Sequence, residues 1–160
     1  MEWIIRPVQP GDNKDLATIV RTALTEFGAN KPGTVFYDET TDHLFELFQT
    51  AGSFYLVAEE NGKVLGGAGI YPTEGLPEGW CELVKMYLKK EARGKGLGQE
   101  LIRRSLERAK MAGYHTVYLE TMPELRKAVT VYEQFGFTYL SEPMGMSGHF
   151  GCDVWMKKTL

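Results

Sequence analysis

The sequence predicts an α/β protein in which one mixed β-sheet carries helices on both faces. Strand-like runs and helix-spaced apolar runs follow the order β-α-α-β-β-β-α-β-α-β-β along the chain. Asn61-Gly62 separates two strand-like runs, and this dipeptide is the strongest short signal for a β-hairpin. The segment 81–121 reads strand, loop, helix, strand, which predicts two parallel neighbouring strands.

The composition limits the class of protein. The 160 residues suit a single domain spanning 1–160, and 43% hydrophobic residues are enough for a sizeable core. A net charge of −3 argues against a nucleic-acid or membrane-surface binder, which would carry a basic excess. Two cysteines do not define a disulfide scaffold, and no apolar run has the length of a signal peptide or membrane span. We therefore expect a cytoplasmic protein without a membrane or nucleic-acid partner.

The first half of the chain predicts three strands and two helices. Asp12 is a candidate cap for the first helix, and Gly28 ends it. Three glycines in the third strand, at positions 66, 67 and 69, predict that a neighbouring group packs closely against it. The expected ranges are 3–8 for a strand, 12–27 and about 41–51 for helices, and 53–60 and 63–71 for strands.

The second half predicts four strands and two helices. The expected ranges are 81–88, 115–121, 137–140 and 152–157 for strands, and about 97–112 and 125–135 for helices. Simple alternation along 81–88 places Glu82, Val84, Met86 and Leu88 on one face of the sheet.

The stretch EARGKGLGQEL, residues 91–101, places three glycines and two cations where a helix begins. A helix N-terminus presents unpaired N–H groups and a partial positive charge, and glycines let an anion approach the backbone. The loop also follows the end of a strand, where ligands of open α/β sheets bind. It lacks the Walker A pattern, and its third glycine comes one residue too early for the dinucleotide fingerprint. The loop therefore predicts a phosphate or pyrophosphate cradle of another kind.

Two motifs resemble the GNAT acetyltransferase superfamily. Arg-x-x-Gly-x-Gly at 93–98, with the strand before it, is similar to the family's acetyl-CoA motif. AVTVYEQFGF at 128–137 is similar to its Ala-x-x-x-Tyr-x-x-x-Gly-Phe signature. The predicted element order also matches across nearly the whole chain. The resemblance implies a GNAT fold and acetyl-CoA as co-substrate.

The resemblance also implies which residues hold acetyl-CoA. The backbone of Met86, Tyr87 and Leu88 would lie along the pantetheine arm. The pyrophosphate would take N–H groups from the loop residues Arg93, Gly94, Lys95, Gly96, Leu97, Gly98 and Gln99. The family commonly has an asparagine seven residues before its signature tyrosine, and here that position is Leu125.

Two residues are candidates for the catalytic proton transfers. Glu82 is the candidate base, because a carboxylate among apolar strand neighbours should have a raised pKa. Glu120 is the second choice, and a water relay without a single base stays open. Tyr132, the signature tyrosine, is implied as the acid that protonates the departing thiolate. Its structural alternative is a packed aromatic ring with a solvated hydroxyl.

The acceptor residues rest on two loops. By the resemblance, the loop 31–37 covers the acceptor site, with Phe36 and Tyr37 lining it, although both rings can instead pack on their own core. The Gly- and Met-rich loop 144–151 lies between the last two strands, where the family often builds its acceptor pocket, and His149 of this loop is a candidate acceptor-binding residue. His149 and Cys152 also permit a zinc site or a Cys–His acyl-enzyme route, but no second ligand pair stands near, and we predict no metal.

Together these features predict an N-acetyltransferase that moves an acetyl group from acetyl-CoA to a primary amine of a small molecule, by direct attack in a ternary complex. Two alternatives stay open: a non-catalytic acyl-CoA-binding or sensing domain, and an enzyme that acetylates protein N-termini or lysines. Homodimers are common in the family, so the resemblance also leaves a homodimer open.

Overall fold

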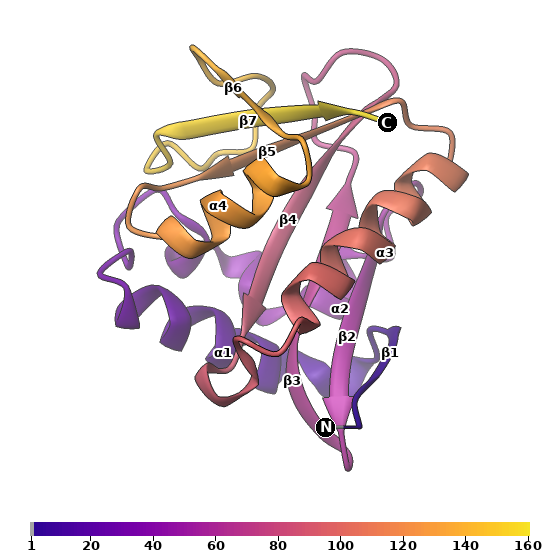
Figure 1. Ribbon diagram of the computed structural model, residues 1–160, viewed down its shortest axis with the longest axis vertical. Coiled ribbons are helices and arrows are strands. Elements are labelled where there is room, and N and C mark those ends of the chain that lie inside the picture. Colours follow the sequence, from indigo (N-terminus) through magenta and orange to yellow (C-terminus); the bar gives the residue numbers. More distant parts are fainter. Residues whose placement is uncertain (1) are drawn as a thin grey trace.

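The computed structural model describes residues 2–160 and contains one seven-stranded mixed sheet (Figure 1). The strands are β1 (Ile4–Pro7), β2 (Phe54–Glu60), β3 (Lys63–Tyr71), β4 (Trp80–Leu88), β5 (Thr116–Thr121), β6 (Thr138–Leu140) and β7 (Val154–Thr159). Their order in the sheet is β1-β2-β3-β4-β5-β7-β6. Among the strands of residues 2–160, only β4 and β5 pair in parallel, as the strand–helix–strand unit predicted. The predicted fold class and strand count are confirmed.

In the part of the chain that the structure describes, four α-helices cover the sheet, and 3₁₀ turns lie in the loops. The helices are α1 (Asn13–Glu26), α2 (Leu44–Leu47), α3 (Leu97–Met111) and α4 (Arg126–Gln134). The apolar faces of α3 and α4 share one core with one face of the sheet, while α1 and α2 pack on the opposite face (Figure 1). Within residues 2–160, none of the helices has the length and apolar character needed to cross a bilayer.

The second helix differs from its predicted range of 41–51. The chain instead makes a 3₁₀ turn at Glu39–Asp42 and a single α-helical turn at Leu44–Leu47. The backbone of His43, at φ −134° and ψ 47°, separates the two turns. Asp38 begins the first turn by accepting the Thr40 N–H at 2.9 Å. Asp12 is the N-cap residue of α1, as predicted, but its side chain caps no N–H of this helix and instead pairs with Arg6 at 2.8 Å.

The predicted hairpin and the glycine-rich strand are confirmed. Asn61 and Gly62 both have positive φ, as a two-residue hairpin turn between β2 and β3 requires. A Cβ on Gly67 or Gly69 would lie 2.4 or 2.6 Å from the Tyr55 ring, so the glycines make room for this side chain. The buried Tyr55 hydroxyl crosses β3 and donates to the Lys85 carbonyl of β4 at 2.7 Å.

That carbonyl belongs to a β-bulge in β4. Gly69 of β3 pairs with Val84, but Gly67 pairs with Tyr87, so β4 carries one extra residue. Lys85 adopts a left-handed φ of 52° there. The bulge reverses the alternation: Glu82 and Val84 face the α1 side, whereas Met86 and Leu88 join the core under α3. The prediction that all four share a face is therefore wrong beyond Val84.

The parallel strands β4 and β5 separate soon after they begin to pair. Their pairing covers three positions and ends at Glu82 and Tyr118. Figure 1 shows the two strands diverging, with α4 lying beside the gap. Beyond Glu82, no strand of the described chain pairs with the β5-facing edge of β4. The divergence therefore leaves backbone N–H and C=O groups of β4 free to bind a ligand.

Candidate active site

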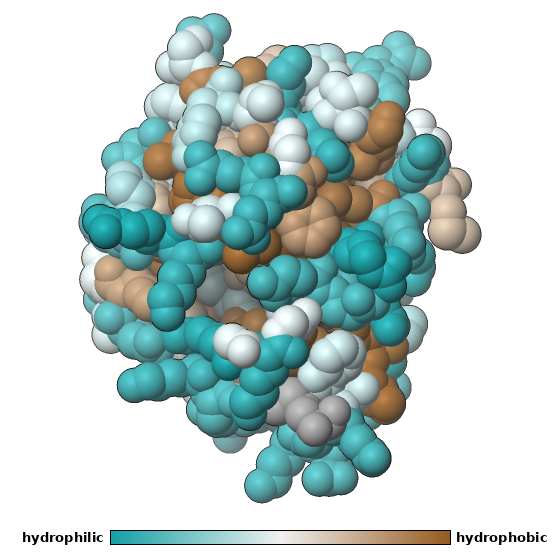
Figure 2. All heavy atoms as spheres, in the orientation of Figure 1, coloured by the Kyte–Doolittle hydropathy of each residue, from teal (hydrophilic) through white to brown (hydrophobic). Residues whose placement is uncertain are grey.

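A cavity of about 510 Å³ occupies the gap between β4 and β5. Its wall includes residues 82–88 of β4, residues 119–122 in and after β5, and residues of α1 and α4. In the space-filling view the surface is hollowed between α1 and α4 (Figure 2). The cavity extends from Glu82 and His149 at one end to Gly94 and Gly98 at the other. We call these the acidic end and the glycine end.

The glycine end has the backbone of an anion cradle. Gly94 and Gly96 have φ of 75° and 84°, which L side chains rarely adopt, and Gly96 caps α3 without a side-chain hydrogen bond. Gly98 has ordinary helical geometry, and a Cβ there would meet only Leu88 at 3.6 Å. Packing within the chain does not require a glycine at this position. The space above Gly98 and the uncapped N–H groups of α3 therefore suit a phosphate.

The other loop residues occupy different positions. Gln99 lines the cavity, Leu97 is fully buried beneath the loop, and Lys95 is exposed at its tip. Arg93 lines the cavity, but its guanidinium donates to the Leu88 carbonyl at 3.0 and 3.2 Å and to Glu26 at 2.7 Å. Arg93 therefore fastens the glycine loop to β4 and α1.

The cavity wall between the two ends comes from β4 and α4. Met86, Tyr87 and Leu88 line the cavity along the unpaired edge of β4, and contact of their backbone with the pantetheine arm stays a prediction. Leu125 lines it where the family commonly has an asparagine, so this part of the wall is apolar. Tyr132 lines it from α4; burial raises the pKa of its hydroxyl, which has no hydrogen-bond partner among the described residues. This side chain keeps its proton at neutral pH and can donate it into the cavity.

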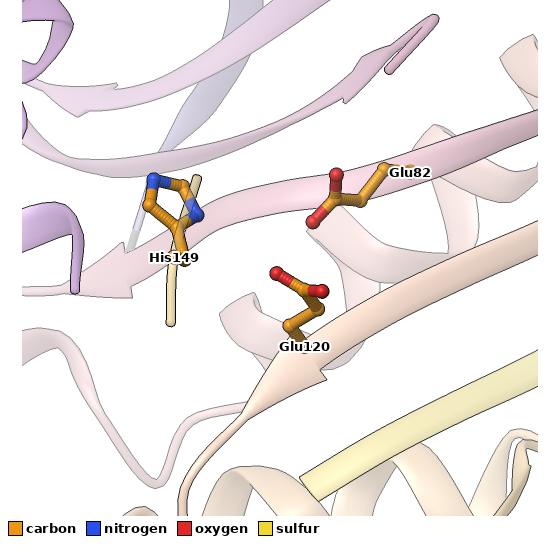
Figure 3. A group of neighbouring side chains, drawn as sticks. All are labelled: Glu82, Glu120 and His149. Atoms are coloured by element: carbon orange, nitrogen blue, oxygen red, sulfur yellow. The ribbon is translucent and has the colours of Figure 1, made fainter. Parts of the chain in front are cut away.

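Glu82 dominates the acidic end. Its side chain points from β4 toward Glu120 of β5, with His149 beside both (Figure 3). One ligand atom from each of these three residues lies within 4.8 Å of the others. Glu82 is 3% exposed, and burial raises its pKa from 4.5 to about 7, with Glu120 adding to the rise. The Thr73 hydroxyl, which donates to Glu82 at 2.6 Å, opposes the rise. A carboxyl with this pKa can accept a proton near neutral pH.

The groups around Glu82 form a hydrogen-bonded network. Glu120 accepts from the hydroxyls of Tyr118, at 2.7 Å, and Ser147. His149 Nε2 bonds the Asp38 carboxylate at 2.8 Å, which joins two loops that lie 111 residues apart in the sequence. The network therefore fixes the orientation of the side chains that surround Glu82. Carboxylates and imidazole can also bind a metal, and the expected absence of one stays a prediction.

Phe36 and Tyr37 do not line the cavity. Their rings pack edge to face with centroids 4.9 Å apart, and Tyr37 is 61% exposed. The neighbouring Thr34 and Val35 line the cavity instead, so contact of either aromatic ring with an acceptor stays a prediction.

Burial, together with Glu120 and Glu82, raises the pKa of the Cys152 thiol to about 12. These neighbours disfavour the thiolate that a Cys–His acyl-enzyme route needs.

Comparison with known proteins agrees with this geometry. The model of the acetyltransferase (GNAT) family matches residues 17–137. The chain belongs to this family. It is 36% identical to the uncharacterized N-acetyltransferase YjgM of Escherichia coli (strain K12), over 98% of this chain and 95% of that protein. The family resemblance predicted from the sequence is thus confirmed.

Solved structures share the fold at low sequence identity. A GNAT-family acetyltransferase from Staphylococcus aureus Mu50 superposes with a TM-score of 0.87 at 16% identity, covering 99% of both chains. The putative acetyltransferase yncA of Salmonella typhimurium, solved with acetyl-CoA, gives a TM-score of 0.76 at 23% identity, covering 99% of this chain and 94% of that one.

Proposed function

We propose that this protein transfers an acetyl group from acetyl-CoA to a primary amine of a small molecule, by direct attack in a ternary complex. The observation that carries the proposal is the placement of Glu82. Its buried carboxyl, with a pKa raised to about 7, lies at one end of a cavity whose other end is a glycine cradle. Family membership and the acetyl-CoA-bound relative support the choice of donor.

The residues of the cavity fit acetyl-CoA. The uncapped start of α3 and the open space above Gly98 suit its pyrophosphate. The unpaired edge of β4 from Met86 to Leu88 suits the amides of its pantetheine arm, which can pair with a strand edge. When bound, acetyl-CoA supplies an activated thioester for acyl transfer. The main role of Arg93 is to hold the glycine loop against β4 through its hydrogen bonds to the Leu88 carbonyl, rather than to attract the phosphates by its charge.

Glu82 receives the proton that the attacking amine must lose. An ammonium has no lone pair, so a base must neutralise the amine before or during attack. Glu120 and the ring of His149 surround the same point, so water held by this network can carry the proton if the amine lies out of direct reach. Tyr132 stands on the opposite wall and donates its hydroxyl proton to the departing thiolate.

The covered acidic end supports a small acceptor rather than a protein. The contact between Asp38 and His149 ties the loop after Val35 to the loop at 147–151. A second contact, from the Met146 N–H to the Glu74 carbonyl at 2.7 Å, ties that region to the loop after β3. These links join the loops around the acidic end, where Glu82 is only 3% exposed. A polypeptide would need an open groove there, whereas a small amine needs only the cavity.

Calorimetry with acetyl-CoA, followed by an amine screen, tests the proposal. We expect the wild-type protein to bind acetyl-CoA and Gly98→Asp to lose binding while remaining folded, because aspartate places a carboxylate where the phosphates would lie. Gly11→Asp, at an exposed glycine of ordinary φ just before α1 and outside the cavity, is the control for the change from glycine to aspartate. The screen detects free CoA thiol. Absence of acetyl-CoA binding by the wild type would refute the proposal.

The screen also distinguishes the non-catalytic alternative. A sensing domain would bind acetyl-CoA tightly but release no CoA thiol with any amine. A catalyst gives release that depends on the acceptor and falls about 100-fold or more in Glu82→Gln, the usual range for loss of a general base. Acetylation of peptides but of no small amine would favour the protein-modifying alternative.

A further inference from the structure

Resting on the proposed function, we infer that the acceptor is an amino acid or a close analogue, whose carboxylate binds the Lys85 ammonium while its amino group faces Glu82. Lys85 lines the cavity from the bulge of β4, on the same strand as Glu82. It is a functional residue that the sequence pattern did not single out.

The Lys85 ammonium is buried and lacks a hydrogen bond. Its side chain is 4% exposed, and no acceptor lies within hydrogen-bond distance of Nζ among the described residues. Buried charges are otherwise paired and hydrogen-bonded, so this exception needs a physical explanation. Within residues 2–160, Ser105 Oγ is the only side-chain polar atom that is inaccessible to solvent and also lacks a hydrogen-bond partner. Lys85 Nζ lacks a partner too, so it must keep some access to solvent. Because Lys85 lines the cavity, this access is through the cavity.

Asp38 does not satisfy this ammonium. The closest approach is 3.8 Å, from Nζ to Asp38 Oδ2. That oxygen already bonds His149 Nε2 at 2.8 Å, while Oδ1 accepts from the backbone N–H and the hydroxyl of Thr40. Asp38 therefore neutralises Lys85 only in part and leaves its three N–H donors for another anion. A ligand carboxylate can make the charge-assisted hydrogen bonds that Asp38 does not.

The strained backbone at Lys85 directs its side chain toward the face of the sheet that carries Glu82. A lysine at φ 52° is unfavourable compared with glycine, and such strain persists where the surroundings enforce it. Here the Tyr55 hydroxyl holds the Lys85 carbonyl at 2.7 Å from across β3. The bulge thereby brings Lys85 to the face that carries Glu82, whereas regular alternation would have placed Lys85 on the opposite face.

The two halves of a zwitterion match the two kinds of charge at this end. Glu82 and Glu120 present carboxylates that attract an ammonium, and Lys85, in the lining of the same cavity, presents a cationic head group. Burial lowers the pKa of Lys85, while the carboxylates of Asp38 and Glu82 raise it. An amine without an acidic group would leave Lys85 buried without a hydrogen bond, which is the feature that makes sites reject such analogues.

Matched acceptors test the inference. Each common amino acid is offered to the wild type beside its carboxamide, with release of CoA thiol as the assay. We expect at least one amino acid to exceed its amide about 10- to 100-fold in kcat/KM, the range for a hydrogen bond to a charged group. Lys85→Met should remove this preference, so that the ratio of kcat/KM for the acid to that for the amide falls toward one, while Lys85→Arg should restore part of the ratio. Lys63→Met, at an exposed position of β3, is the matched control.

A binding measurement separates this inference from a folding defect. Calorimetry of the preferred amino acid into the protein–CoA complex, which cannot react, should show binding to the wild type and Lys63→Met but not to Lys85→Met. Retained binding of CoA by Lys85→Met shows that the variant is folded. Equal turnover of acids and amides, or unchanged preference in Lys85→Met, overturns the inference but leaves the proposed function standing. Failure of the wild type to bind acetyl-CoA refutes the proposed function, and this inference with it.

Discussion

Replacement of Glu82 by glutamine should stabilise the protein while it slows the reaction. The carboxyl is buried, and its pKa rises from 4.5 to about 7 because burial disfavours the charged form. One pKa unit corresponds to about 1.4 kcal/mol, so the ionised Glu82 lowers the free energy of unfolding by about 3 kcal/mol at pH 8.5. Glutamine keeps an oxygen that can accept the hydrogen bond from Thr73, now at 2.6 Å, and it removes the charge.

The effect must depend on pH in a defined direction. The folded protein holds the Glu82 proton more tightly than the unfolded chain, so its stability falls as pH rises from 4.5 to about 7. Above that range the penalty is complete, and at pH 5 it is only about 1 kcal/mol. Glu82→Gln has no such group. Its advantage over the wild type should therefore grow with pH and then level off.

Urea denaturation at pH 5 and pH 8.5 measures the difference, and Glu78→Gln provides an exposed control that should change little. Activity is followed in the same samples through release of CoA thiol and should fall about 100-fold or more. Equal or lower stability of Glu82→Gln at pH 8.5 would show that the carboxylate is compensated in the folded state. The assignment of a raised pKa, and with it the role as base, would then be wrong.

Three further predictions concern the same cavity. Tyr55→Phe, which loses the 2.7 Å bond to the bulge, should cost about 1 kcal/mol in urea denaturation and also lower kcat; an unchanged kcat would mean that the bulge holds without it. Tyr132→Phe should lower kcat about 10-fold or more with little change in KM or thermal stability, and an unaltered kcat would leave only a packing role. The pH profile of kcat/KM should rise through about pH 7 to a plateau, and this rise should vanish in Glu82→Gln.

The sequence predicts those parts of the fold that depend on local chemistry. Asn61-Gly62 favours a hairpin turn by itself, and the glycine loop before α3 favours an anion cradle by itself. The bulge at Lys85 was not predictable in this way. Nothing in CELVKMYL departs from a regular strand, and the left-handed turn depends on a hydrogen bond from Tyr55, 30 residues away in the sequence. A pairing between distant residues decided which face Lys85 occupies.

The candidate site divides in the same manner. Glu82 could be proposed from its strand neighbours, because burial alone accounts for most of its raised pKa. Asp38 was visible only as one of several acidic residues in its loop, and its contact with His149 required two loops to meet. Lys85 gave no signal at all in the sequence, since a lysine on a strand is ordinarily solvated. Its meaning comes from its burial and its missing hydrogen bonds.

The two ends of the cavity recognise their ligands by opposite means, and this difference predicts how the site tolerates substitution. The glycine end uses neutral backbone N–H groups that carry no desolvated charge, so changes at Gly98 should affect donor binding with little effect on stability. The acidic end uses buried charges, and each one costs stability until a ligand or a neighbour compensates it. Substitutions at Glu82 and Lys85 should therefore change stability and acceptor specificity together. A protein selected for stability alone would lose these charges first, so we expect stabilised variants to accumulate changes at the acidic end and to lose acceptor turnover before they lose acetyl-CoA binding.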